Sequence, residues 1–238
     1  MSSLAADPAG HLRPSRVVVG AVSFDPLTVA TATAYVRDAL GRGCGGLLLV
    51  VDRGLHRQGL GPELESATVV VAASATAVWA SRLAGSGLPQ RVTGIALAES
   101  LCAVAAVDGR QVYVIGGQPG GRGVPTGAQR VAAVWGLRHR GLRIAGSASP
   151  GPAPADRWDV AEVVEAKPDL VFVSAGPSGE RIIAALRPEL PSAWLIGCPG
   201  LVDAVLGGQV PTEPGPGALA MLGRGVARRL SRWLRRHP

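Results

Sequence analysis

Short apolar runs alternate with longer segments of helical periodicity along most of the chain. The short runs are rich in Val, Ile and Leu, which predicts buried strands at residues 16–22, 47–51, 67–73, 112–115, 143–146, 170–174 and 193–197. Between these runs, apolar residues recur at helical spacing, which predicts helices at 27–40, 76–84, 95–107, 127–138, 159–166 and 179–186. Asp25 or Thr28 is the expected cap of the first helix.

This alternation predicts a Rossmann-like α/β fold, with a mainly parallel sheet and helices on both faces. Ligands of such sheets bind beyond the carboxyl ends of the strands. Five loops should therefore meet at one edge, namely those that begin at Asp52, Ser74, Gly116, Gly176 and Pro199. Residues 1–15 are expected to be a flexible leader, residues 16–215 the α/β domain, and residues 216–238 a basic C-terminal amphipathic helix.

The C-terminal segment separates apolar from basic side chains. Leu222, Val226, Leu230, Trp233 and Leu234 share one face at helical spacing, and arginines occupy another. A basic amphipathic helix with a Trp favours an anionic membrane surface. The residues expected to contact the membrane are Arg228, Arg229, Arg232, Trp233, Arg235 and Arg236. The alternative is a helix packed on the body with its arginines in water.

Charge and composition narrow the functional classes. The 238 residues are 47% hydrophobic, enough for a large core, and carry a net charge of +7. Six arginines of residues 218–238 supply most of this excess, so the body is nearly neutral and we expect no nucleic-acid partner. Three distant cysteines and four scattered histidines show no metal-ligand spacing, so no metal or other cofactor is expected. The chain shows neither a signal peptide nor an apolar run of about 20 residues, which indicates a cytoplasmic protein.

Two glycine-rich loops carry the candidate chemistry. The first is QVYVIGGQPGGRG at residues 111–123, and the second is PDLVFVSAGPSGER at residues 168–181. Glycines allow positive φ and a close approach of the backbone to a ligand. A helix N-terminus after such a loop presents N–H groups to a phosphate. We therefore expect half of a nucleotide-diphosphate pocket here, although a plain strand-to-helix turn has the same composition.

Four ordered motifs resemble the WecG/TagA/CpsF glycosyltransferases. They are LPQRVTGIAL at 88–97, VYVIGGQPG at 112–120, AKPDLVFVSAGPSGE at 166–180 and AWLIGCPGLVDAVLGG at 193–208. The resemblance runs from about residue 16 to 236, and the basic tail is similar to that of the family. It implies transfer of an N-acetylmannosamine-like sugar from a UDP-sugar to a lipid-diphosphate-linked acceptor, in bacterial cell-surface polysaccharide synthesis. It also implies work at the inner face of the plasma membrane, as a peripheral protein and a possible homo-oligomer.

The resemblance assigns substrate-binding roles to residues in three loops. They are Arg91, Thr93 and Gly94; Gly116, Gly117, Pro119 and Gly120; and Gly176, Pro177, Ser178 and Glu180. Arg91 and the Gly116–Gly123 backbone would stabilise the leaving diphosphate during direct displacement at the anomeric carbon. Each residue has a structural alternative: a solvated loop arginine, a helix cap at Thr93, or a first-turn Glu180 favoured by the helix dipole. Asp169 and Asp203 are interpreted as structural.

The chain departs from the family where the chemistry is expected. The family's proposed catalytic Asp corresponds to Ser74, and the Asp of its "GxDL" segment to Ala96. A serine without a neighbouring base cannot take a proton as a carboxylate does. The catalytic residue is therefore not identified, and Asp52 is a weak substitute for the family's Asp. Enzymatic activity is uncertain, and the alternative is a non-catalytic member that binds a nucleotide-sugar or a partner. A dehydrogenase is disfavoured because no GxGxxG follows the first strand.

Overall fold

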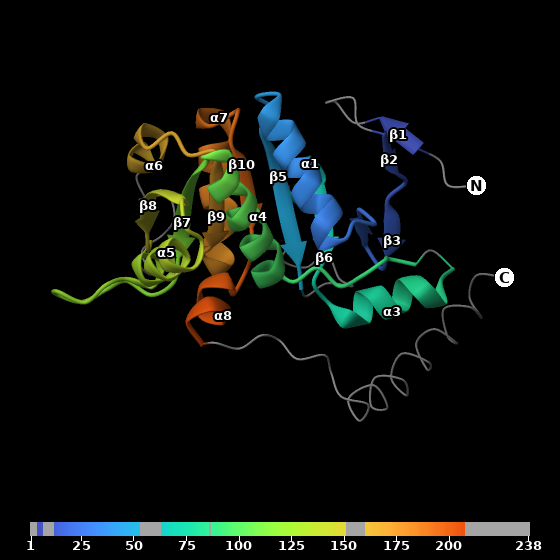
Figure 1. Ribbon diagram of the computed structural model, residues 1–238. Helices are drawn as coiled ribbons and strands as arrows, with labels where there is room; N and C mark the ends of the chain where they lie inside the picture. Colours follow the sequence, from blue (N-terminus) through green and yellow to red (C-terminus); the bar gives the residue numbers. More distant parts are fainter. Residues whose placement is uncertain (1–3, 7–11, 53–62, 86, 151–159, 208–238) are drawn as a thin grey trace.

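A computed structural model describes residues 4–6, 12–52, 63–85, 87–150 and 160–207 (Figure 1). The predicted tail helix at 216–238, with its membrane-contact residues, lies outside this set, as does the larger part of the predicted leader. Within the leader, β1 (Leu4–Ala6) pairs antiparallel with β2 (Leu12–Pro14).

Six strands form one parallel sheet in the order β6–β5–β10–β9–β7–β8 (Figure 1). This confirms the predicted Rossmann-like α/β class. The strands are β5 (Gly46–Val51), β6 (Val69–Ala72), β7 (Gln111–Gly116), β8 (Arg143–Ala148), β9 (Leu170–Ser174) and β10 (Trp194–Gly197). Because the four inner strands are buried on both faces, they appear in the sequence as unbroken apolar runs.

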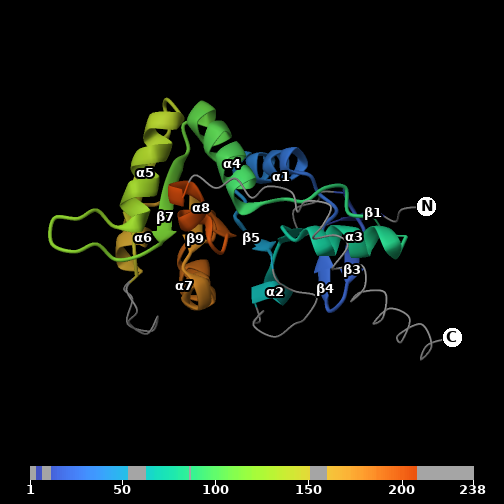
Figure 2. The same ribbon diagram turned by 90° about the horizontal axis from the view of Figure 1, so that it is seen from below.

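Helices cover both faces of the sheet, as expected (Figure 2). One face packs against α1 (Val29–Gly41), α4 (Gly94–Asp108), α5 (Gly127–Arg138) and α8 (Leu201–Gly207). The other packs against α2 (Glu63–Ser66), α3 (Ala75–Leu83), α6 (Ala161–Glu165) and α7 (Gly179–Glu189). The sequence pattern missed α2 and α8, since four and seven residues are too few to show helical periodicity. Thr28 caps α1 in a capping box with Thr31.

The expected first strand at 16–22 is wrong. Gly20 has a φ of 64° and turns the chain, so β3 (Val17–Val19) folds back antiparallel on β4 (Val22–Phe24), outside the large sheet. Asp25 then anchors this hairpin to the edge strand β6. Its buried carboxylate accepts a hydrogen bond from Val70 N at 2.7 Å, while its own N–H donates to Val70 O at 2.8 Å. Asp25 thus pairs with a strand and does not cap a helix.

We expect Asp25→Ala to lower the free energy of unfolding by about 2–3 kcal/mol, because it removes a buried, charged hydrogen-bond acceptor. Urea denaturation would measure the loss. Asp108→Ala is the control, since Asp108 pairs with Arg37 at the surface and should cost about 1 kcal/mol or less. Equal losses for the two variants would contradict the anchoring role.

Candidate functional site

The chain leaves neighbouring strands β7 and β9 toward opposite faces of the sheet. Gly116 and Ser174 are paired at the carboxyl ends of these strands. Beyond Gly116 the chain runs to α5 on one face, and beyond Ser174 it runs to α7 on the other. Such a divergence is where open α/β sheets bind their ligands. A cavity of about 340 Å³ lies here, lined by Gly116, Gly117, Gln118, Pro119, Pro150, Ser174, Ala175, Gly176, Ser178 and Asp203. We call it the central cavity.

Three glycines of the first loop are required by contacts within the protein. Gly116 has a φ of 138°, and a Cβ there would collide with the Ser174 carbonyl. Gly117 has a φ of 73°, and its Cβ would lie 2.7 Å from Val202 Cγ1. A Cβ on Gly120 would strike the Val124 carbonyl. Gly116 and Gly117 therefore shape the wall of the central cavity through close packing of the loop on β9 and α8, while Gly120 packs within the loop itself.

The N-terminus of α5 does not offer the N–H groups that the loop pattern predicts. Gly127 N donates to Gln118 O at 3.0 Å, Ala128 N donates to Ser149 Oγ at 3.2 Å, and Gln129 N donates to Thr126 Oγ1 at 3.2 Å. All three donors are satisfied within the protein. A phosphate at this helix end would have to displace one of these partners, and the diphosphate pocket expected at this loop stays a prediction.

The second loop is built differently. Gly176 has a φ of 54° and opens a 3-10 turn over Gly176–Ser178, which leads directly into α7. Ser178 precedes α7 but its side chain makes no capping hydrogen bond. Glu180 stands in the first turn, where the helix dipole favours a carboxylate. Gly176 and Ser178 line the central cavity. Glu180 lines a second, smaller cavity, which is described below.

The charges around the central cavity favour hydroxyl groups over phosphates. Among the described residues, its lining carries the Asp203 carboxylate, the Gln118 amide and the Ser178 hydroxyl, and no Lys or Arg. A second hollow of about 480 Å³ shares Gln118, Pro119 and Asp203 with it and adds Arg130. Arg130 lies in the first turns of α5, and no described residue forms an ion pair with its exposed side chain. The sequence arguments missed Arg130, and they interpreted Asp203 as structural although it lines both hollows.

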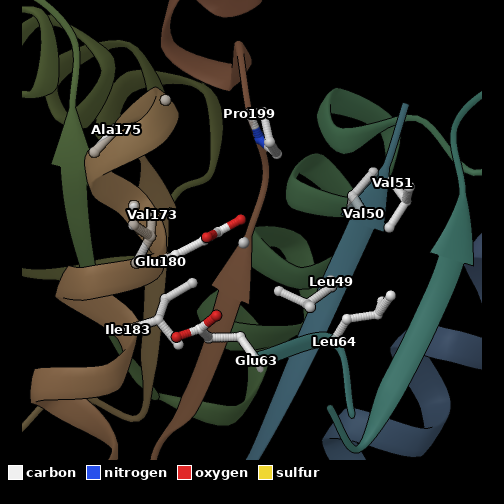
Figure 3. A pocket seen from close by; sticks show the side chains of 13 residues that line it. Leu49, Val50, Val51, Glu63, Leu64, Val173, Ala175, Glu180, Ile183 and Pro199 are labelled. Atoms are coloured by element: carbon white, nitrogen blue, oxygen red, sulfur yellow. The ribbon is translucent and has the colours of Figure 1, made fainter. Parts of the chain in front are cut away.

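A smaller cavity of about 90 Å³ lies at the carboxyl ends of β5, β9 and β10 (Figure 3). Its wall is apolar except for two glutamates, Glu63 from α2 and Glu180 from α7, whose carboxylates point into it. We call it the glutamate cavity. Ala175 and Gly176 line both this cavity and the central one, so the two adjoin. The Oε2 atom of Glu63 is buried and has no hydrogen-bond partner among the described residues.

The remaining candidates gather at the end of β6. Ser74 precedes α3, and its hydroxyl lies 2.5 Å from Thr76 Oγ1. Arg91 Nε donates to Ala73 O at 2.6 Å, which ties the loop before α4 to this strand. Three strands separate β6 from β7, a distance of roughly 19 Å at the usual spacing. Arg91 and the glycine loop thus share the predicted edge of the sheet but do not share a cavity.

Thr93 and Gly94 lie between the residues at the end of β6 and the glycine loop after β7. Thr93 caps α4, its hydroxyl accepting from Ala96 N at 3.3 Å, which is the structural alternative given for it. A Cβ on Gly94 would lie 3.4 Å from that of Cys198, so the start of α4 packs on the residue that follows β10. Asp52 is exposed at the end of β5. None of these side chains lines the central cavity or the glutamate cavity.

Two further reactive groups have structural roles. Burial raises the pKa of the Cys198 thiol, so it stays protonated and is a poor nucleophile. Asp169 accepts from Gln111 N at 2.7 Å and from Arg110, as its structural interpretation predicts. In the described part of the chain, no three His, Cys, Asp or Glu side chains are grouped as a metal site. No helix within that part has the length and apolar character to cross a membrane.

The geometry agrees with a comparison against protein families. The model of the glycosyl transferase WecG/TagA/CpsF family matches residues 17–219. The chain belongs to this family. The match includes β3 to β10 and α8, hence all the residues that line the three hollows. A comparison with curated proteins finds no match.

We expect Gly116→Ala to destabilise the protein by about 2 kcal/mol or more, because the new methyl group meets the Ser174 carbonyl at a φ unsuited to alanine. Gly121→Ala is the matched control: nothing lies within 4 Å of its Cβ position, and its change should be below about 0.5 kcal/mol. Thermal unfolding would measure both. A neutral Gly116→Ala would contradict the close packing of β7 on β9.

Proposed function

We propose that this chain transfers an N-acetylmannosamine-like sugar from a UDP-sugar to a lipid-diphosphate-linked acceptor. As a member of the WecG/TagA/CpsF family it is a glycosyltransferase of cell-surface polysaccharide synthesis. The observation that carries the specific proposal is the central cavity, which lies where β7 and β9 diverge and continues into the hollow that contains Arg130. The donor occupies both hollows.

The charges suggest how the donor lies. Hydroxyl-bearing sugar fits the central cavity, where Asp203, Gln118 and Ser178 provide acceptors and donors. The diphosphate lies toward Arg130, whose guanidinium neutralises the charge that grows on the leaving oxygen. Gly116 and Gly117 hold the shape of the central cavity, Gly120 lines the Arg130 hollow, and Pro119 lines both. Arg130 thus replaces Arg91 as the cation next to the donor.

The acceptor approaches from the other end of the edge. Arg91, at the end of β6, and the start of α4 at Thr93 and Gly94 are suited to the acceptor's own diphosphate, since they lie away from the donor hollows. The basic segment at 216–238 would hold the enzyme on the anionic inner face of the plasma membrane, where lipid-linked acceptors reside. This membrane role rests on the sequence pattern alone.

A second candidate function is binding without turnover. The family's catalytic Asp is replaced by Ser74, whose hydroxyl already pairs with that of Thr76. Such a protein would bind the nucleotide-sugar and release no UDP from it.

We expect Arg130→Ala to weaken UDP binding about tenfold or more and to leave uridine binding within about twofold, because only the diphosphate needs the guanidinium. Isothermal calorimetry would measure both ligands. Arg140→Ala is the control, since Arg140 is also exposed but lies beyond the opposite end of α5. Equal losses for UDP and uridine would place the diphosphate elsewhere.

Turnover decides between the two candidate functions. The assay follows UDP release from UDP-N-acetylmannosamine with a lipid-diphosphate acceptor in detergent. Acceptor-dependent release, unchanged by EDTA, is the expected result. UDP binding without release would favour the binding protein, and a failure to bind UDP would contradict both candidates.

A further inference from the structure

Two carboxylates converge beside the donor site in a chain that lacks one at position 74. Glu63 comes from the short helix α2, after β5, and Glu180 comes from the first turn of α7, after β9 (Figure 3). Both point into the glutamate cavity, whose other walls are formed by apolar side chains such as Leu64 and Ile183 and by glycines. A cavity of about 90 Å³ has room for a few water molecules or for a ligand's hydroxyl-bearing edge.

Among the described residues, this cavity offers Glu63 no side-chain hydrogen-bond donor. The buried Oε2 atom of Glu63 has no partner in that part of the chain, and the described lining contains no Lys, Arg, His or hydroxyl side chain. A buried carboxylate oxygen without a donor is costly, and native proteins rarely keep one unless a ligand or water completes it. A substrate hydroxyl, which donates one hydrogen bond, would complete it.

The position relative to the donor suits a single displacement. Ala175 and Gly176 form the wall common to the glutamate cavity and the central cavity. Arg130 belongs to the hollow on the other side, reached through Gln118 and Asp203. A sugar in the central cavity therefore has the diphosphate on its Arg130 side and the glutamates on the opposite side. In a single displacement, the base works on the face opposite the leaving group.

We propose that Glu180 is the general base of this enzyme and that Glu63 positions the acceptor hydroxyl, together replacing the carboxylate absent at position 74. The inference rests on the proposed glycosyl transfer. Glu180 takes the proton of the acceptor hydroxyl while that oxygen bonds to the anomeric carbon. The bond from the anomeric carbon to the diphosphate oxygen breaks, and its electron pair leaves with UDP. Glu63 accepts a hydrogen bond from a neighbouring hydroxyl of the acceptor and so holds the attacking hydroxyl in line.

The test compares Glu180→Gln, Glu63→Gln and the control Glu189→Gln, which changes an exposed carboxylate at the far end of α7. UDP release from UDP-N-acetylmannosamine with a lipid-diphosphate acceptor gives kcat, and calorimetry gives UDP affinity. Glu180→Gln should lower kcat about 10²- to 10³-fold, the range expected for loss of a general base. Glu63→Gln should lower kcat about tenfold, with UDP affinity and melting temperature unchanged in both. Glu189→Gln should match the wild type.

A rescue experiment separates proton transfer from a structural role. Formate is small enough to enter the space left by Glu180→Ala and should restore turnover in proportion to its concentration, but should not stimulate the wild type. Retention of a third or more of the wild-type kcat by Glu180→Gln would overturn the inference while leaving the transferase function intact. UDP binding without turnover in the wild type would also overturn it, and leave only donor binding. A wild type that does not bind UDP would remove the proposed function itself.

Discussion

The contact between Gly116 and Ser174 is the constraint on which the site depends. The two residues end neighbouring parallel strands, and the backbone of one packs so closely on the carbonyl of the other that only glycine fits at position 116. From this point the chain turns to α5 on one face and to α7 on the other. The central cavity is the space that the two departing loops leave open. A side chain at position 116 would collide with the Ser174 carbonyl and disturb both the strand pairing and the cavity that it frames.

The divergence also orders the charges along the edge of the sheet. At the carboxyl ends of the strands, the glutamate cavity adjoins the central cavity with Asp203, and the central cavity adjoins the hollow of Arg130. Glu63 and Glu180 thus lie on one side of the space assigned to the sugar and Arg130 on the other, while Asp203 lines both the central cavity and the Arg130 hollow. This polarity suits a reaction in which a proton leaves on one side and a diphosphate on the other. Glu63 and Glu180 are therefore the carboxylates that we propose act in place of one at position 74.

The sequence predicts the sheet better than the site, for physical reasons. Buried parallel strands are continuous apolar runs, so β5 to β10 could be recognised within a few residues. The prediction of a first strand at 16–22 was wrong because Gly20 turns the chain within an apolar run. A positive φ does not change the hydrophobicity pattern of a sequence. The glycine loops were found correctly. Gly116, Gly117 and Gly120, however, serve packing within the protein, which composition cannot distinguish from ligand approach. Strand order, which sets Arg91 apart from Gly116, follows from the crossovers and is not visible in local patterns.

Glu63 and Arg130 show why the sequence did not predict these residues of the candidate site. Glu63 lies on a four-residue helix that follows a stretch without periodicity, so no motif marks it, and only the packing of α2 near α7 brings it to Glu180. Arg130 stands at an ordinary exposed helix position, and its role appears once α8 is placed beside α5. Both depend on tertiary contacts between segments far apart in the chain.

The central claim is that the donor binds where β7 and β9 diverge. A crystal structure of the protein with UDP tests it most directly. We expect density for the nucleotide along the central cavity and the Arg130 hollow, with the diphosphate within hydrogen-bonding distance of Arg130. The terminal phosphate oxygen that bears the sugar in the donor should point toward Gly176. UDP seated instead at the end of β6, against Arg91 and Ser74, would contradict it.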